Sequence, residues 1–156
     1  MNVGIVGIGV VGSANKVGFE KLGHNVLVHD IKLGTTISDV LNTDCVFVCV
    51  PTPSKSNGDC NTDIVESVIE ELSKVKYKGV VAIRSSTVPG FTRLMSEQYK
   101  NLQICFVPEF VRERCAEHDF INEHELLANG TKDNYVFYLI KNVHGHFPKN
   151  VVHLSQ

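Results

Sequence analysis

Short apolar runs rich in β-branched residues alternate along this chain with stretches of helical periodicity. The runs are apolar almost throughout, as expected for strands that are covered on both faces. Strands separated by helices predict βαβ units and a parallel sheet. We therefore expect one α/β domain over residues 1–156, with a Rossmann-type, doubly wound, mainly parallel sheet. The expected strands are Val3–Val6, Asn25–Asp30, Cys45–Val50, Val80–Arg84, Gln103–Val107, Glu125–Ala128 and Val151–Leu154.

Capping residues set the ends of the expected helices. Glu66, three residues after Asp63, predicts a capping box at the start of one helix. Thr131 is the expected N-cap of the last helix, which Gly145 ends. The first helix begins within the glycines of 9–12 and runs to about residue 22, and shorter helices are expected at Ile37–Leu41 and Thr92–Tyr99.

The composition is that of a globular protein and argues against several other classes. Fifteen basic and seventeen acidic residues give a net charge of −2, which does not indicate a nucleic-acid partner. The cluster of Lys74, Lys76, Lys78 and Arg84 is interpreted as a solvated helix end and loop. No apolar run approaches the roughly 18 residues of a membrane helix, and no secretory signal opens the chain. We therefore expect a cytoplasmic protein without a membrane partner.

The motif Gly7-Ile8-Gly9-Val10-Val11-Gly12 follows the first expected strand and opens the first expected helix. A G-x-G-x-x-G motif alone is a weak signal, but here the second strand ends in Asp30, 18 residues after Gly12. In this context the first glycine permits a tight turn, the second admits a pyrophosphate, and the third lets the helix pack on the strand. Free N–H groups at the helix start face the phosphates. The predicted dinucleotide-binding residues are Gly7, Gly9, Val10, Val11, Gly12 and Asp30.

Asp30 indicates which dinucleotide is bound. Its carboxylate would accept hydrogen bonds from the adenosine ribose hydroxyls and repel a 2′-phosphate, which favours NAD over NADP. Lys32, two residues on, weakens that preference. The competing interpretation treats the glycines as turn formers and Asp30 as an ordinary acid at a strand end.

Three further motifs follow the third, fourth and fifth expected strands. They are Val50-Pro51-Thr52-Pro53, Ser86-Thr87-Val88-Pro89 and Pro108-Glu109-Phe110-Val111-Arg112-Glu113. In order and spacing they resemble the V-P-T-P, S-T-V-P and P-E-F-x-R-E motifs of the UDP-glucose and GDP-mannose dehydrogenases, over nearly the whole chain. Ligands of open α/β sheets bind outside the carboxyl ends of the strands, which is where all three motifs lie.

The resemblance implies an NAD-dependent oxidoreductase that oxidises the primary alcohol of a nucleotide sugar to a carboxylate. It implies that Thr87 lies near the nicotinamide and helps to hold a catalytic water. It also implies that Glu109 serves in the acid–base and hydrolytic step, with Glu113 close by. Two carboxylates four residues apart would face one cleft, where one could be protonated while the other is charged. The further cofactor contacts that it implies are Val50, Pro51, Thr52, Ser86 and Thr87.

Simpler roles compete with several of these assignments. Thr87 could cap the helix that follows it, and Glu113 lies in a charge run of the kind that is usually solvated surface. Cys115 has no base supplied to it by the sequence and is interpreted as a spectator. His144, His146 and His153 are interpreted as loop histidines, so no metal site is expected.

The sequence departs from the resembled family in two respects. The family's catalytic cysteine, lysine and asparagine lie in a central helix and second domain beyond Val151–Leu154, whereas this sequence stops at Gln156. Only fourteen residues connect Asp30 to Cys45, where the family has a longer segment that helps to wall the adenine pocket. The chain is therefore expected to be either a fragment or a split protein whose substrate domain is a separate chain, and a homodimer is a further expected assembly.

Three functional hypotheses follow from these features. In the first, the chain is the cofactor domain of a nucleotide-sugar dehydrogenase. In the second, it is a stand-alone NAD-binding module that regulates or scaffolds without catalysis. In the third, it is the N-terminal domain of a β-hydroxyacid or 6-phosphogluconate type dehydrogenase, which shares the phosphate loop but lacks a Pro-Glu-Phe strand end.

Overall fold

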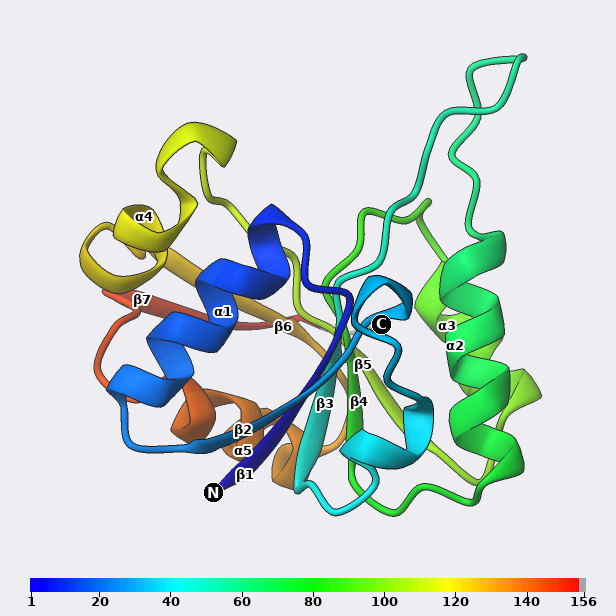
Figure 1. Cartoon of the computed structure of the whole chain (residues 1–156), viewed down its shortest axis with the longest axis horizontal. Helices are drawn as coiled ribbons and strands as arrows, with labels where there is room; N and C mark the ends of the chain where they lie inside the picture. The colour runs from blue at the N-terminus through cyan, green and yellow to red at the C-terminus, as the bar shows by residue number, and fades with distance from the viewer. Residues whose placement is uncertain (155–156) are drawn as a thin grey trace.

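A single sheet in the order β2-β1-β3-β4-β5-β6-β7 forms the centre of the molecule (Figure 1). The structure is a computed structural model and describes residues 1–154. Neighbouring strands pair in parallel except β5 and β6, which pair antiparallel through Phe106 and Gly130. This confirms the predicted Rossmann-type α/β fold. The strands are β1 Asn2–Val6, β2 Asn25–His29, β3 Cys45–Val48, β4 Val80–Ile83, β5 Gln103–Phe106, β6 Leu126–Gly130 and β7 Asn150–Leu154.

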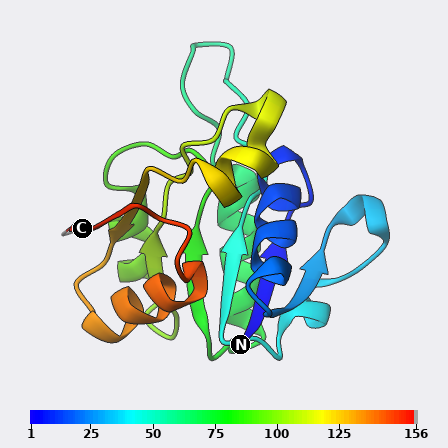
Figure 2. The same cartoon turned by 90° about the vertical axis from the view of Figure 1, so that its left-hand side faces the viewer.

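Helices cover both faces of this sheet. On one face lie α2 and α3, and on the other lie α1, α4 and α5, which Figure 2 shows from the front. The helices are α1 Val10–Lys21, α2 Asp63–Lys74, α3 Phe91–Gln98, α4 Ala116–Asn122 and α5 Asn134–His144. Short 3-10 helices are η1 Ile31–Leu33, η2 Ile37–Val40 and η3 Glu113–Cys115. In the part of the chain that the structure describes, no helix combines the length and apolar character needed to cross a membrane.

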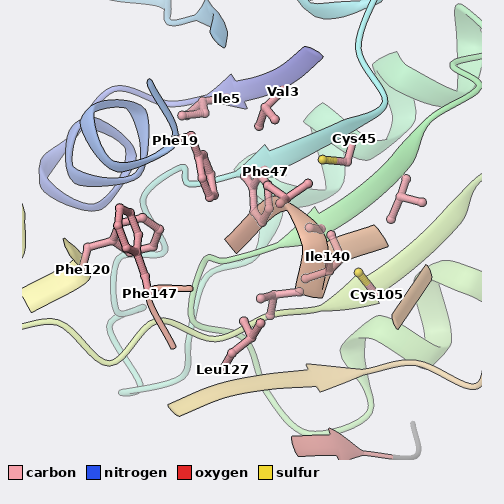
Figure 3. Packing of buried hydrophobic residues seen from close by; sticks show 14 of the residues in the cluster. Val3, Ile5, Phe19, Cys45, Phe47, Cys105, Phe120, Leu127, Ile140 and Phe147 are labelled. Carbon is pink, nitrogen blue, oxygen red and sulfur yellow. The ribbon is translucent and has the colours of Figure 1, made fainter. Parts of the chain in front are cut away.

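Alternate side chains of each strand divide between two apolar layers. In β3, Cys45 and Phe47 point toward α1 and α5, whereas Val46 and Val48 point toward α2. Figure 3 shows the first layer, where the rings of Phe19 and Phe47 pack at 4.9 Å between centroids. Because both faces are buried, the strands need apolar residues at every position, which explains the continuous apolar runs of the sequence.

The order of the strands creates a switch point between β1 and β3. The chain leaves β1 toward β2 on one side and then returns to place β3 on the other side. Loops that follow β1 and β3 therefore diverge at the carboxyl edge of the sheet, which is where open α/β sheets bind ligands. The loop between β3 and α2 projects from the body of the molecule at this edge (Figures 1 and 2).

Each expected strand is present within two residues of its predicted ends, but several helix details were wrong. The N-cap of α5 is Asp133, whose carboxylate accepts from the N–H groups of Tyr135 and Val136, and not Thr131. The expected capping box of α2 is replaced by a hydrogen bond from Thr62 Oγ1 to Glu66 Oε1. The helix expected at 37–41 is a 3-10 turn, and α4 was not predicted.

The third glycine of the motif is predicted to be indispensable for folding, unlike the second. A Cβ on Gly12 would lie 1.9 Å from the carbonyl oxygen of Gly7, whereas a Cβ on Gly9 would meet no atom within 4 Å. Overpacking against backbone cannot be relieved by a rotamer change, so Gly12→Ala should destabilise the fold by about 3 kcal/mol or more. Gly9→Ala should change stability by less than about 1 kcal/mol. Urea unfolding of both variants measures the difference, and equal loss in both would contradict this account.

Candidate functional site

The loop after β1 makes a tight turn against the end of β3. Gly7 has φ +93°, a conformation that L side chains rarely adopt. A Cβ on Gly7 would lie 2.8 Å from the backbone oxygen of Cys49, and its N–H donates to the carbonyl of His29 at 2.8 Å. This turn therefore joins the ends of β1, β2 and β3 and aims the following helix at the sheet edge.

The start of α1 presents backbone donors to open space. Gly9 is its N-cap and provides no side-chain cap. The N–H groups of a first helical turn have no partner within the helix, and the helix dipole adds partial positive charge there. Because nothing lies within 4 Å of a Cβ built on Gly9, an anionic group can approach this backbone closely. The residues present therefore fit the pyrophosphate of a dinucleotide.

Asp30 lies beside this loop with its carboxylate fixed by two backbone donors. Oδ2 accepts from the N–H of Ile8 at 2.7 Å, and Oδ1 accepts from the N–H of Lys32 at 2.8 Å. These two hydrogen bonds, that from Ile8 first, lower the pKa of Asp30. The carboxylate is therefore charged at neutral pH and retains lone pairs for further donors.

A cavity of about 330 Å³ runs from the glycine loop to one face of α2, and we call it the glycine-loop cavity. Ligand pockets in proteins begin at roughly this size. Burial raises the pKa of the Cys49 thiol in its wall to about 12, so this sulfur is a neutral wall atom. The cavity is lined by segments 6–9, 29–32 and 49–51 and by Ile64, Ser67, Val68 and Glu71 of α2.

The structure thus brings five of the predicted cofactor residues together, namely Gly7, Gly9, Asp30, Val50 and Pro51. Val10, Val11 and Gly12 form the adjoining first turn of α1. Thr52 lies half-buried just beyond Pro51, and Ser86 is exposed, with its carbonyl accepting from the Cys60 thiol at 3.4 Å.

Thr87 lies elsewhere. It lines a separate cavity of about 500 Å³ together with Phe106, Gly130 and Leu154. The alternative role of Thr87 as a helix cap is wrong, because the N-cap of α3 is Gly90, at φ +87°.

Glu109 is buried in an ion pair that the sequence did not predict. Its side chain is 6% exposed, and Oε2 lies 3.0 Å from Nη1 of the fully buried Arg84. Asn15 of α1 donates to the same oxygen at 3.1 Å and accepts from Arg84 Nε at 2.9 Å. Oε1 accepts from the N–H of Phe110 at 3.1 Å. The carboxylate is thus held by α1, by β4 and by its own turn.

Arg84 was wrongly assigned to a solvated basic cluster. Its guanidinium packs over the rings of Phe47 and Phe120, at 5.1 and 5.6 Å from their centroids. Its position at the end of an apolar strand was the available signal, since a charge within a buried run needs a buried partner. The partner is Glu109, 25 residues away, a distance in sequence that no local pattern spans.

The prediction that His144 lies in a loop is also wrong. It is the last residue of α5, fully buried, with Nδ1 bonded to the carbonyl of Ile140 at 2.7 Å and Nε2 facing Arg84. Burial, and then the charge of Arg84, hold its pKa well below the usual value. The neutral imidazole therefore donates through Nδ1 and accepts from the arginine through Nε2.

Glu113 does not share a cavity with Glu109, although one common cleft was expected. It is exposed in η3 and lines a groove of about 570 Å³ between α1 and α4, together with Val10, Arg114 and Cys115. The Cys115 thiol faces the carboxylate of Asp119 at 3.5 Å. Hydrogen bonds from Arg112 hold the pKa of Asp119 far below its usual range, so it is a poor base for this thiol.

Residues 31–148 match the family model described as the UDP-glucose/GDP-mannose dehydrogenase family, NAD binding domain. The chain belongs to this family. The match covers the V-P-T-P, S-T-V-P and P-E-F-x-R-E motifs, whereas the glycine loop precedes it. Membership of this family favours the first functional hypothesis over the β-hydroxyacid alternative.

Relatives and solved structures agree with this assignment. UDP-glucose 6-dehydrogenase of Rickettsia bellii is 26% identical over 78% of this chain and 37% of its own length. The enzyme AglM of Haloferax volcanii is 25% identical over 85% of this chain and 42% of its own. A UDP-glucose dehydrogenase structure from Pyrobaculum islandicum superposes with a TM-score of 0.85, at 21% identity, over 99% of this chain and 46% of that one. The chain spans less than half the length of these relatives.

A GDP-mannose dehydrogenase structure from Pseudomonas aeruginosa has a TM-score of 0.84 at 23% identity, over 99% of this chain and 46% of that one. At these identities the structural likeness shows a shared fold. This member of the UDP-glucose/GDP-mannose dehydrogenase family therefore has the family's NAD-binding domain, with the motifs at the carboxyl edge of its sheet.

The buried His144 predicts that this family member loses stability in mild acid. Its folded-state pKa is depressed, so the unfolded chain, with an imidazole pKa near 6.5, binds an extra proton below that pH. The free energy of unfolding should fall as pH drops from 7 to 5, by up to about 1.4 kcal/mol per pH unit for each such histidine. Urea unfolding at several pH values measures this slope.

Two variants test the assignment of that slope. His144→Gln should reduce it, because the group that titrates is removed. His146→Gln, at an exposed neighbour, should leave it unchanged. An unaltered slope in His144→Gln would assign the acid sensitivity to another group.

Proposed function

We propose that this chain binds NAD and is the cofactor-binding domain of a dehydrogenase that oxidises the primary alcohol of a nucleotide sugar to a carboxylate. The observation that carries the proposal is that one cavity combines an open helix start at Gly9 with the charged Asp30. An anion-binding helix end beside an acceptor for ribose hydroxyls is what a dinucleotide without a 2′-phosphate requires.

Each wall of the glycine-loop cavity has a distinct task in this proposal. The first-turn N–H groups of α1 donate to the pyrophosphate, and the close approach depends on the missing side chain at Gly9. Asp30 accepts from the ribose hydroxyls while Ile8 and Lys32 fix its orientation. Apolar side chains of Val50 and Ile64 flank the adenine end. NAD, when bound, supplies the hydride acceptor.

The residues proposed for the chemistry are Thr87, Glu109 and Glu113. Thr87 follows β4 at the carboxyl edge, and the family motif supports a place near the nicotinamide. Glu109 offers Oε1 as a proton acceptor because Oε2 is held by Arg84 and Asn15. Glu113 is proposed to act at the exposed groove between α1 and α4.

The names of the relatives support a sugar-nucleotide substrate. We propose that residues 1–156 are one cofactor domain and that the enzyme is complete only together with a substrate domain. In that case hydride transfer requires the completing part.

A second candidate function is a stand-alone NAD-binding module without catalysis. It is favoured by one observation, namely that Thr87, Glu109 and Glu113 each line a different cavity and none lines the glycine-loop cavity. Both candidates require NAD binding. NAD reduction with UDP-glucose after addition of a substrate domain separates them, because the module would stay inactive.

Replacing the Asp30 carboxylate by an amide should weaken NAD binding. Asp30→Asn removes a charged acceptor, which is worth about 1.5–3 kcal/mol, or roughly a 10–100-fold rise in Kd. The discrimination against NADP should shrink in the same variant, since the repulsion of the 2′-phosphate is lost. Calorimetric titration with both dinucleotides measures the two effects. Asp59→Asn, in the loop between β3 and α2, is the matched control.

Gly9→Ala should abolish most NAD binding without unfolding the chain. The added methyl group occupies the open space through which the pyrophosphate would approach the helix start. We expect at least a tenfold rise in Kd, about 1.4 kcal/mol. Full NAD affinity in this variant, or no saturable binding by the parent protein, would refute the proposed cofactor site.

A further inference from the structure

A second polar cavity, of about 240 Å³, lies beyond the carboxyl end of β5. We call it the Glu109 cavity. It is bounded by the turn that follows β5, by the end of α4 and by the start of β6. Its polar lining consists of Glu109, Asp119, Glu123, His124 and Glu125. It is separate from the glycine-loop cavity, and nothing in the proposed cofactor site uses it.

His124 is a buried polar residue of this cavity, and one of its two ring nitrogens is unsatisfied in the described part of the chain. The residue is 6% exposed, and within the described residues its Nδ1 has no hydrogen-bond partner. Its ring packs against Phe120 at 5.1 Å and against His144 at 5.7 Å between centroids. A buried nitrogen without a partner is unfavourable, so the site favours a ligand that can bond to it.

Glu109 provides a second polar atom in the same cavity. Oε2 is occupied by Arg84 and Asn15, whereas Oε1 accepts one hydrogen bond in the described part of the chain, from the N–H of Phe110. A carboxylate oxygen can accept more than one. The cavity has room for water, which occupies about 30 Å³ per molecule in the liquid. A water between Oε1 and Nδ1 would satisfy both groups.

Burial is the main influence on the proton affinity of the His124 imidazole, and nearby charges act on it in both directions. Burial lowers its pKa, Glu109 acts to raise it, and Arg84 acts to lower it. Among the other groups, Asp119 is bound by Arg112, and Glu123 and Glu125 pair with Lys149. The neighbouring His144 is itself neutral. Glu109 is therefore the carboxylate that influences the proton affinity of His124.

We propose that His124 and Glu109 form a water-bridged proton relay. The inference rests on the proposed function, in which an alcohol is oxidised by a nicotinamide dinucleotide. A bound nicotinamide dinucleotide would supply the hydride acceptor for the alcohol C–H bond, and Glu109 Oε1 would take the O–H proton. The proton then crosses the bridging water to Nδ1 of His124, which becomes an imidazolium and later releases the proton to solvent. His124 thereby restores Glu109 as a carboxylate for a second oxidation.

Two measurements on the full chain test the relay without NAD. A crystal structure should show a water within hydrogen-bond distance of both His124 Nδ1 and Glu109 Oε1. An NMR pH titration should show the His124 imidazole pKa shifted downward in Glu109→Gln, and unshifted in the matched control Glu113→Gln. The His124→Gln variant assigns the signal. A dry cavity, or a His124 pKa that is the same in Glu109→Gln and in the parent, would overturn the relay.

Calorimetry separates this proposal from the proposed function. His124→Gln should bind NAD with unchanged Kd, because His124 does not line the glycine-loop cavity. If the parent protein fails to bind NAD, the proposed function is refuted while the link between His124 and Glu109 is still measured. If NAD binds and the link is absent, only the relay is refuted. Glu109→Gln removes the charged partner of Arg84, which lowers stability, and the crystallographic test of the parent protein does not depend on that variant.

Discussion

The contacts of the buried Arg84 guanidinium are the interactions on which the other parts of the structure depend. A charge in the core is tolerated only when its donors are satisfied. Here they are satisfied by Asn15 from α1, by Glu109 and the carbonyls of Val107 and Pro108 after β5, and by His144 from α5. Helices from both ends of the chain and the central sheet therefore meet at one side chain.

That arrangement connects the glycine loop to the Glu109 carboxylate. The helix α1 begins at the glycine loop and, one turn later, contributes Asn15 to the buried ion pair. The close contact between Gly12 and Gly7 fixes how α1 rests on β1. The position of Glu109 is therefore determined by the same helix that offers its first turn to a dinucleotide. The glycine loop and the Glu109 carboxylate are thus linked through the helix α1.

How far the sequence predicts this structure depends on how local each signal is. The strands, α1, α2 and the place of Asp30 follow from patterns within about 20 residues, and the structure has them where the patterns indicate. The pairing of Arg84 with Glu109 and with His144 joins residues 25 and 60 positions apart, so no local pattern could reveal it. The short helix α4 has a mostly polar sequence without a clear helical pattern, and its place is set by packing of Phe120 against α1.

The three glycines of the phosphate loop look equivalent in the sequence but are constrained for different reasons. Gly7 and Gly12 are fixed by backbone that lies against them, whereas the space beside Gly9 is open. A side chain at Gly9 would therefore leave the fold intact and would interfere only with ligand binding. In an evolving lineage, that position is therefore free to drift once dinucleotide binding is no longer selected. The residue found there in related sequences reports whether a copy of this domain is still under selection to bind its cofactor.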